Sequence, residues 1–247
     1  MKTPVLIAAY NEEALIGQTL RCIPADLLEP IVAVNGSSDQ TANIARSFGA
    51  TVLESSEPGK LPAIQRALYQ LGERALEPVL YLDADAFPAF PRKWPEASLR
   101  KSLIGQPWVG TGLVGYHGGR VIDDISNSLL LTAVKTKAAL KGRPQASGAN
   151  MATYIKDFRL LKRILDMPHI WLGEDAALAK MITMEGGRFD QTLNPYSLVL
   201  ASSRFVPPIS ELVRLGRKEV SRRKRAEYIG RAAPGSRPYH PKSKLGI

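Results

Sequence analysis

The sequence has a single cysteine, Cys22, among 247 residues, which excludes an internal disulfide framework and a cysteine-built zinc site. It also lacks any run close to the roughly 18 consecutive apolar residues that a membrane-spanning helix requires. Its first residues show neither a long apolar segment nor the small-residue cleavage site of a secretory signal. We therefore expect a cytoplasmic protein.

Acidic residues are scarce at the C-terminal end of the chain. Residues 204–247 contain twelve Lys or Arg and three Asp or Glu, a net charge of +9, whereas the whole chain carries +10. The rest of the chain is therefore nearly neutral. We expect two parts, a globular domain over 1–205 and a basic helix with an extended tail over 206–247.

The basic segment also has an apolar side. Its apolar face, spaced as in a helix, consists of Ile209, Leu212, Val213, Gly216 and Val220. A basic amphipathic helix can lie on an anionic membrane surface, so we expect peripheral attachment to the cytoplasmic membrane face. A solvated terminus is the alternative. No aromatic platform interleaves with the basic run 221–225, which argues against nucleic acid as the partner.

Strand and helix signals alternate over the first hundred residues and predict an α/β domain with a largely parallel sheet. There, strands are expected at 5–9, 31–34, 51–53 and 79–82, and helices at 12–22, 39–49 and 58–76. The second half is less regular. There we expect strands at 106–113, 145–154, 188–189 and 197–201, and helices at 122–141 and 173–184.

Polar residues follow three of the early strands, in the segments 10–12, 35–39 and 83–85. Ligands of open α/β sheets bind outside the carboxyl ends of the strands, so these segments should converge on one site. Asp83 and Asp85 are of the type that binds Mg²⁺ or Mn²⁺ together with substrate phosphates. Ordinary turn and cap residues are the alternative for this pair. Phe87 stands where an aspartyl-phosphate hydrolase normally has Thr or Val, which argues against that enzyme class.

Five motifs in order make the sequence resemble the family 2 glycosyltransferases over about residues 4–205. The motifs are Ala8-Ala9-Tyr10-Asn11-Glu12-Glu13, Asn35-Gly36-Ser37-Ser38-Asp39-Gln40-Thr41, Gly59-Lys60, Leu82-Asp83-Ala84-Asp85 and Gly173-Glu174-Asp175. The resemblance implies a single GT-A domain, Rossmann-like, with a largely parallel central sheet flanked by helices. It further implies an inverting, metal-dependent enzyme that takes a sugar from a nucleotide-diphosphate sugar.

The resemblance also assigns residues to the donor. Tyr10 would lie against the nucleobase, Asn11 and Glu12 near the nucleoside, and Lys60 against the diphosphate. Asp85 would bind the Mn²⁺ or Mg²⁺ ion, and Asp83 would bind ribose or a metal-bound water. Asn35 is expected on the donor side too, although Val34-Asn35 replaces the family's usual Asp-Asp and leaves the nucleobase open.

On the acceptor side, the resemblance makes Asp175 the general base that deprotonates the acceptor hydroxyl of a glycan or lipid-linked substrate. Gly148, Asn150 and Glu174 are expected near the transferred sugar and the acceptor. A bulged strand is the alternative for 148–150, and a helix start rich in acids for 174–175. The sequence has no Gln-x-x-Arg-Trp after Asp175, which argues against processive polymer synthesis, and no third metal ligand is assigned.

Two other functions stay open. A non-catalytic protein that binds a nucleotide sugar or nucleic acid could use the same scaffold, although such binding needs no acceptor-side base. A sugar-phosphate nucleotidyltransferase would need a glycine-rich loop after the first strand, and Ala8-Ala9-Tyr10-Asn11 has none. An oxidoreductase is disfavoured because no Gly-x-Gly-x-x-Gly follows an early strand.

Overall fold

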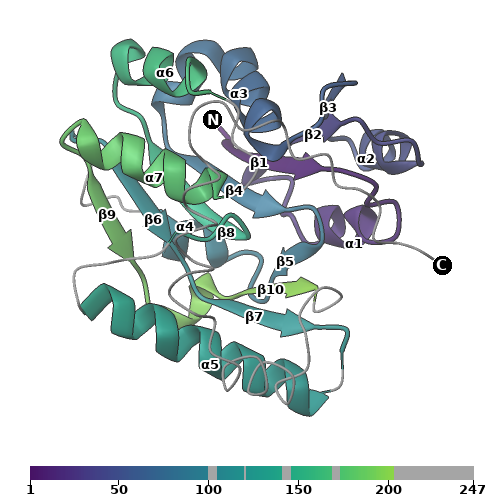
Figure 1. Cartoon of the computed structure of the whole chain (residues 1–247). Coiled ribbons are helices and arrows are strands. Elements are labelled where there is room, and N and C mark those ends of the chain that lie inside the picture. Colours follow the sequence, from purple (N-terminus) through teal and green to yellow (C-terminus); the bar gives the residue numbers. More distant parts are fainter. Residues whose placement is uncertain (100–104, 120, 141–145, 169–172, 203–247) are drawn as a thin grey trace, which may run out of the picture. The chain divides into compact units, whose positions relative to one another are not determined.

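A computed structural model describes residues 1–99, 105–119, 121–140, 146–168 and 173–202 (Figure 1). These residues lie in one structural unit, Met1–Arg204. The basic segment 206–247 falls outside the described residues, so its predicted helix and tail stay predictions. Within the described residues, no helix has both the length and the apolar character that a bilayer crossing demands.

A seven-stranded sheet forms the centre of the described unit (Figure 1). In spatial order its strands are β3 (Thr51–Ser55), β2 (Leu28–Asn35), β1 (Thr3–Ala9), β4 (Val79–Asp83), β8 (Asn150–Tyr154), β6 (Trp108–Thr111) and β9 (Arg188–Gln191). Only β8 runs antiparallel to its neighbours. The α/β class and the largely parallel sheet expected from the sequence are therefore confirmed.

Side chains on alternate positions of the strands enter two separate cores, as the period of two in a strand requires. On β1, Val5 and Ile7 face one core and Leu6 the other. The first core also takes side chains from α1 (Ile16–Arg21), α2 (Thr41–Ser47) and α4 (Trp94–Ser98). The second core takes side chains from α3 (Lys60–Leu71), α6 (Phe158–Leu165) and α7 (Glu174–Met184). The sheet is thus covered on both faces, as a parallel sheet needs.

A second, three-stranded sheet follows the carboxyl end of β4. Its strands, in the order β5 (Ala86–Pro88), β10 (Val199–Ser202) and β7 (Val114–His117), join the segment after Asp85 to the end of the described chain. The long helix α5 (Val121–Leu140) lies along β7 (Figure 1), and the Tyr116 backbone N–H donates to the Ser128 hydroxyl over 2.9 Å. The segment carrying Asp85 is thus held between the two sheets.

Three predicted boundaries differ most from the structure. The first helix starts at Ile16 rather than at 12. The residues before it form a turn, in which the Glu12 carbonyl accepts hydrogen bonds from the N–H groups of Leu15 and Ile16. The helix expected over 58–76 ends at Leu71, where Gly72 has φ 56° and leads into the 3₁₀ helix η1 (Gly72–Leu76). The strand expected from 145 starts only at Asn150. The elements that the sequence reading missed are β5, α4, β7, α6 and the 3₁₀ helix η3 (Pro195–Ser197).

Candidate active site

The loops after β1 and β2 hold each other through side-chain to backbone hydrogen bonds. Asn11, at φ 51°, accepts from the Ser38 N–H over 2.9 Å, while its own N–H donates to the Ser37 hydroxyl over 2.9 Å. The Glu12 N–H donates to the Thr41 hydroxyl over 2.8 Å. The Asp39 carboxylate accepts from the N–H groups of Glu13 and Thr41. These residues build a fixed loop pair at the sheet edge, a positional role that the sequence reading missed.

Tyr10 and Asn35 lie at the same edge but in different environments. Tyr10 is 53% exposed and its ring lies beside Gly36, the residue after β2. Asn35 is 6% exposed, and its Oδ1 has no hydrogen-bond partner within the described part of the chain. A buried amide oxygen without a partner is costly, so this position is suited to a donor group on a ligand.

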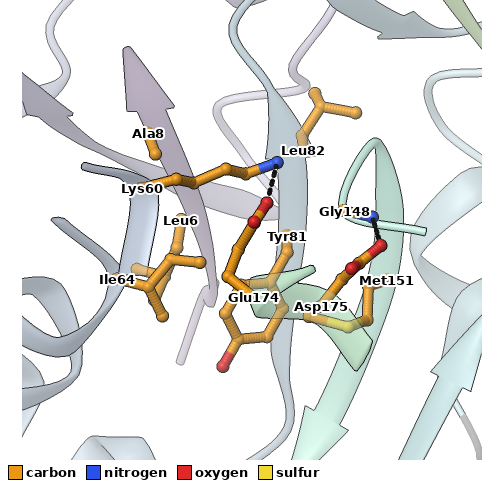
Figure 2. A pocket seen from close by; sticks show the side chains of 10 residues that line it. All are labelled: Leu6, Ala8, Lys60, Ile64, Tyr81, Leu82, Gly148, Met151, Glu174 and Asp175. Atoms are coloured by element: carbon orange, nitrogen blue, oxygen red, sulfur yellow. Dashed lines mark hydrogen bonds and ion pairs between the residues drawn. The ribbon is translucent and has the colours of Figure 1, made fainter. Parts of the chain in front are cut away.

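The Lys60 ammonium lies between two carboxylates that come from distant parts of the sequence. It is 2.5 Å from Asp83 Oδ1 at the end of β4 and 3.2 Å from Glu174 Oε1 at the start of α7. Figure 2 shows Lys60 and Glu174 pointing toward each other from α3 and α7. Burial opposes the charged form, but the two carboxylates outweigh it and raise the pKa of Lys60 above its ordinary value. Lys60 is therefore a permanent cation.

Asp175 is oriented by backbone groups. Its Oδ2 accepts from the Gly148 N–H over 3.1 Å, as Figure 2 shows, and its Oδ1 accepts from the Ala176 N–H over 2.7 Å. Each carboxylate oxygen keeps a further lone pair, so the group can still accept a proton. Gly148 also leaves space for Lys60, since a Cβ there would lie 2.5 Å from Nζ. The structure thus brings Lys60, Asp83, Gly148, Glu174 and Asp175 together, as the order of motifs predicted.

Asn150 sits next to this cluster but has a different environment from the one expected. Its side chain is 1% exposed, and its amide nitrogen donates to the carbonyls of Leu113 and Ser197 over 2.7 and 2.6 Å. Its Oδ1 accepts from the Trp94 indole N–H over 3.1 Å. This geometry favours a structural role, since both amide donors are already used and the group is buried away from a sugar. The buried Trp94 partner was not identified from the sequence.

Glu174 has a partner that the sequence did not predict. Its carboxylate pairs with Lys60, and its predicted place beside the sugar and the acceptor stays a prediction. Asp85 lies two residues beyond β4, and its carbonyl accepts from the Ser202 N–H over 3.1 Å. Nowhere in the described residues are three His, Cys, Asp or Glu side chains grouped as a metal site.

An N-terminal segment of the chain matches a known family model. Residues 5–96 match the model of glycosyl transferase family 2. The resemblance to family 2 glycosyltransferases is confirmed. The 4,4'-diaponeurosporenoate glycosyltransferase of Staphylococcus aureus (strain USA300) is 37% identical over 89 residues, which are 33% of this chain and 23% of that relative. The match to the family 2 model therefore covers little more than a third of the chain, and the alignment spans less than a quarter of this relative.

Solved glycosyltransferases share the fold of the described unit. A mannosyltransferase from Pyrobaculum calidifontis, solved with GDP-Man and Mn²⁺, aligns with a TM-score of 0.57 and 21% identity, over 92% of this chain and 64% of that one. Glucosyl-3-phosphoglycerate synthase from Mycobacterium tuberculosis, solved with Mn²⁺, UDP and glucosyl-3-phosphoglycerate, aligns with a TM-score of 0.52 and 22% identity. That alignment covers 87% of this chain and 76% of the synthase. The expected GT-A fold is confirmed.

The family 2 match ends at residue 96, so it includes Tyr10, Asn35, Lys60, Asp83 and Asp85 but not the segments after them. Gly148 and the pair 174–175 reach the site through the fold, on the loop before β8 and at the start of α7. The roles of these later residues therefore depend on the geometry just described.

Proposed function

We propose that the chain is an inverting, non-processive glycosyltransferase that moves a sugar from a nucleotide-diphosphate sugar to an acceptor hydroxyl. The observation that carries the proposal is the convergence of Lys60 and Asp83 with Asp175 at one edge of the sheet. Lys60 and Asp83 lie in the segment that matches family 2, and the Gly148 N–H orients Asp175. A nucleotide-binding protein without catalysis would have no use for a carboxylate held on the acceptor side.

The donor would lie along the carboxyl ends of β1, β2 and β4. Tyr10 offers an exposed ring to the nucleobase, and the free Oδ1 of Asn35 offers an acceptor. Lys60 supplies a fixed positive charge for the diphosphate. Glu12 is assigned to the ribose. The main function of Asn11 in this scheme is to hold the loop that the nucleoside contacts.

Asp83 and Asp85 are the residues assigned to a divalent cation. The fit rests on their chemistry, since carboxylate oxygens suit Mn²⁺ and Mg²⁺, and on the fact that Asp83 already attracts a cation, the Lys60 ammonium. A bound ion would neutralise the charge that develops on the departing nucleoside diphosphate. The two solved relatives described above contain Mn²⁺ together with a nucleotide, which supports the same assignment here.

Asp175 is assigned as the general base. Its carboxylate takes the proton of the acceptor hydroxyl while that oxygen bonds to the anomeric carbon. The bond from the anomeric carbon to the phosphate oxygen breaks, and its electron pair leaves with the nucleoside diphosphate. A single displacement of this kind inverts the anomeric configuration. The hydrogen bonds from the Gly148 and Ala176 N–H groups fix the direction of the carboxylate, as a positioned base requires.

A donor screen tests the proposal. Each nucleotide sugar is added at about 100 times its Kd, with Mn²⁺ or with a chelator, and the free energy of unfolding is measured. A ligand that binds only the folded protein at this concentration should add about 2.7 kcal/mol. That corresponds to a rise in Tm of about 5–10 °C for a chain of this size. If no nucleotide sugar stabilises the protein in a metal-dependent way, the proposed function is wrong.

The acceptor is proposed to be a glycan or lipid-linked hydroxyl compound, with the basic segment 206–247 holding the enzyme on an anionic membrane surface. The support is the net charge of +9 after residue 203 and the apolar face of that segment. Sedimentation with anionic and neutral vesicles should show anionic-specific binding of the full chain that a chain ending at Pro207 loses, and that weakens as salt rises. Equal binding of the two chains would leave the segment as a solvated terminus.

A further inference from the structure

The shared position of Lys60 gives Glu174 a function beyond those assigned above. Lys60 contacts two carboxylates at once, and the side chains of Lys60, Asp83 and Glu174 are 30%, 30% and 16% exposed. Asp83 is the last residue of β4, one of the strands that would hold the donor, whereas Glu174 begins α7, the helix that also carries Asp175. The ammonium therefore bridges the donor side of the site to the base side.

The same ammonium contacts a carboxylate that the proposed function assigns to a divalent cation. Lys60 uses Asp83 Oδ1 at 2.5 Å, and Asp83 is one of the two carboxylates assigned to the metal. Two cations on one carboxylate repel each other strongly in a partly buried site, so they compete for it. A divalent cation on Asp83 would therefore weaken the hold of that carboxylate on the ammonium.

Glu174 provides the second place for the displaced ammonium. Its Oε1 already lies 3.2 Å from Nζ, so Lys60 needs little movement to pair with Glu174 alone. The space around Nζ is kept open by Gly148, where a Cβ would lie only 2.5 Å away. Lys60 retained by Glu174 would still lie at the diphosphate position, which is what the proposed donor chemistry needs.

We propose that Glu174 is a positioning residue that competes with Asp83 for the Lys60 ammonium. Binding of a divalent cation at Asp83 then transfers Lys60 to Glu174, where its charge is placed to contact the diphosphate. This inference rests on the proposed function. It predicts that the effect of Glu174 on the cation passes through Lys60, rather than through contact between Glu174 and the cation.

The test is Mn²⁺ binding to the full chain without nucleotide, read from the electron paramagnetic resonance signal of the free ion, in wild type, K60M, E174Q and the double variant. K60M removes the competing cation while keeping most of the side-chain stem, and should tighten Mn²⁺ binding about tenfold. E174Q leaves Asp83 as the one carboxylate within the described residues that pairs with Lys60, and should weaken Mn²⁺ binding by about threefold to tenfold. The opposite signs of the two changes are the first result expected.

The double variant decides the mechanism. If Glu174 acts through Lys60, adding E174Q to K60M should change the Mn²⁺ affinity by less than about twofold, a non-additivity that reveals coupling. If Glu174 acts on the cation directly, E174Q should weaken binding by the same factor with and without Lys60, and that result overturns the inference. K60M binding Mn²⁺ no more tightly than wild type overturns it as well.

Two further measurements keep the result interpretable. K60Q and K60Q/E174Q repeat the cycle with another uncharged residue, with Tm recorded for every variant, in case K60M does not fold. E29Q breaks the Arg74–Glu29 pair, of similar exposure at 2.6 Å but at the start of β2, and should leave Mn²⁺ binding unchanged. Failure of wild type to bind Mn²⁺ or any nucleotide would count against the proposed function, whereas additivity in a wild type that binds both would count against this inference alone.

Discussion

The two halves of the described chain contribute to the site in different ways. Up to residue 99, long buried strands alternate with helices, and the polar groups follow directly from the strand ends. From residue 105 on, no described strand is as long as β1 or β2, β8 runs antiparallel, and the residues that reach the site lie on a loop and at a helix start. In the proposed function, the first half holds the donor and the second half places the reacting group against it.

Asp175→Asn separates these two contributions most strongly. If Asp175 is the base, kcat should fall by on the order of 10²–10⁴, because the amide cannot take the proton of the acceptor hydroxyl. Donor affinity should stay within a few-fold, since the donor residues belong to the first half. Steady-state kinetics with an identified acceptor, together with donor titration, measure both quantities. Near-normal turnover, or a product that retains the anomeric configuration of the donor, would refute the assignment.

Asn150→Ala tests how the second half is held in place. The substitution leaves the Trp94 indole N–H and the carbonyls of Leu113 and Ser197 without their partner in a buried place. Each unpaired buried group costs about 1–3 kcal/mol, so we expect unfolding to become easier by about 3–5 kcal/mol. Denaturant unfolding measures this loss.

Asn43→Ala is the matched control for that substitution, because Asn43 is exposed on α2, where its amide donates to the exposed Gln40 side chain and accepts from the exposed Arg46 side chain. It should change stability by less than about 0.5 kcal/mol. If both substitutions cost the same, Asn150 is not the structural link between β8, α4 and η3, and its predicted role beside the sugar regains support.

The contrast between the halves also explains what the sequence could predict. The buried runs 5–9 and 79–82 are long enough to identify strands, and the rule for open α/β sheets then brings Tyr10, Asn35 and Asp83 to one edge. The strands β5 and β7 are too short to give a period, and they depend on pairing with β10. The missed elements are therefore those that tertiary contacts define.

Single residues show the same limit. The motif order placed Glu174 in the site, but its pairing with Lys60 depends on how α7 packs against α3 and α6. Asn150 could be read as a sugar ligand because an exposed and a buried amide look alike in sequence. Only the hydrogen bonds of the amide oxygen and the amide nitrogen show that the Asn150 side chain is a buried one.

Binding of a nucleoside diphosphate to wild type and Asp85→Ala, titrated by calorimetry with and without Mn²⁺, tests the central claim most directly. Asp26→Ala, which removes an exposed carboxylate paired with Arg92, is the control and should behave as wild type. The account predicts that Mn²⁺ strengthens binding to wild type and to the control, and that Asp85→Ala folds normally but loses this strengthening. Equal, metal-enhanced binding by wild type and Asp85→Ala would contradict it.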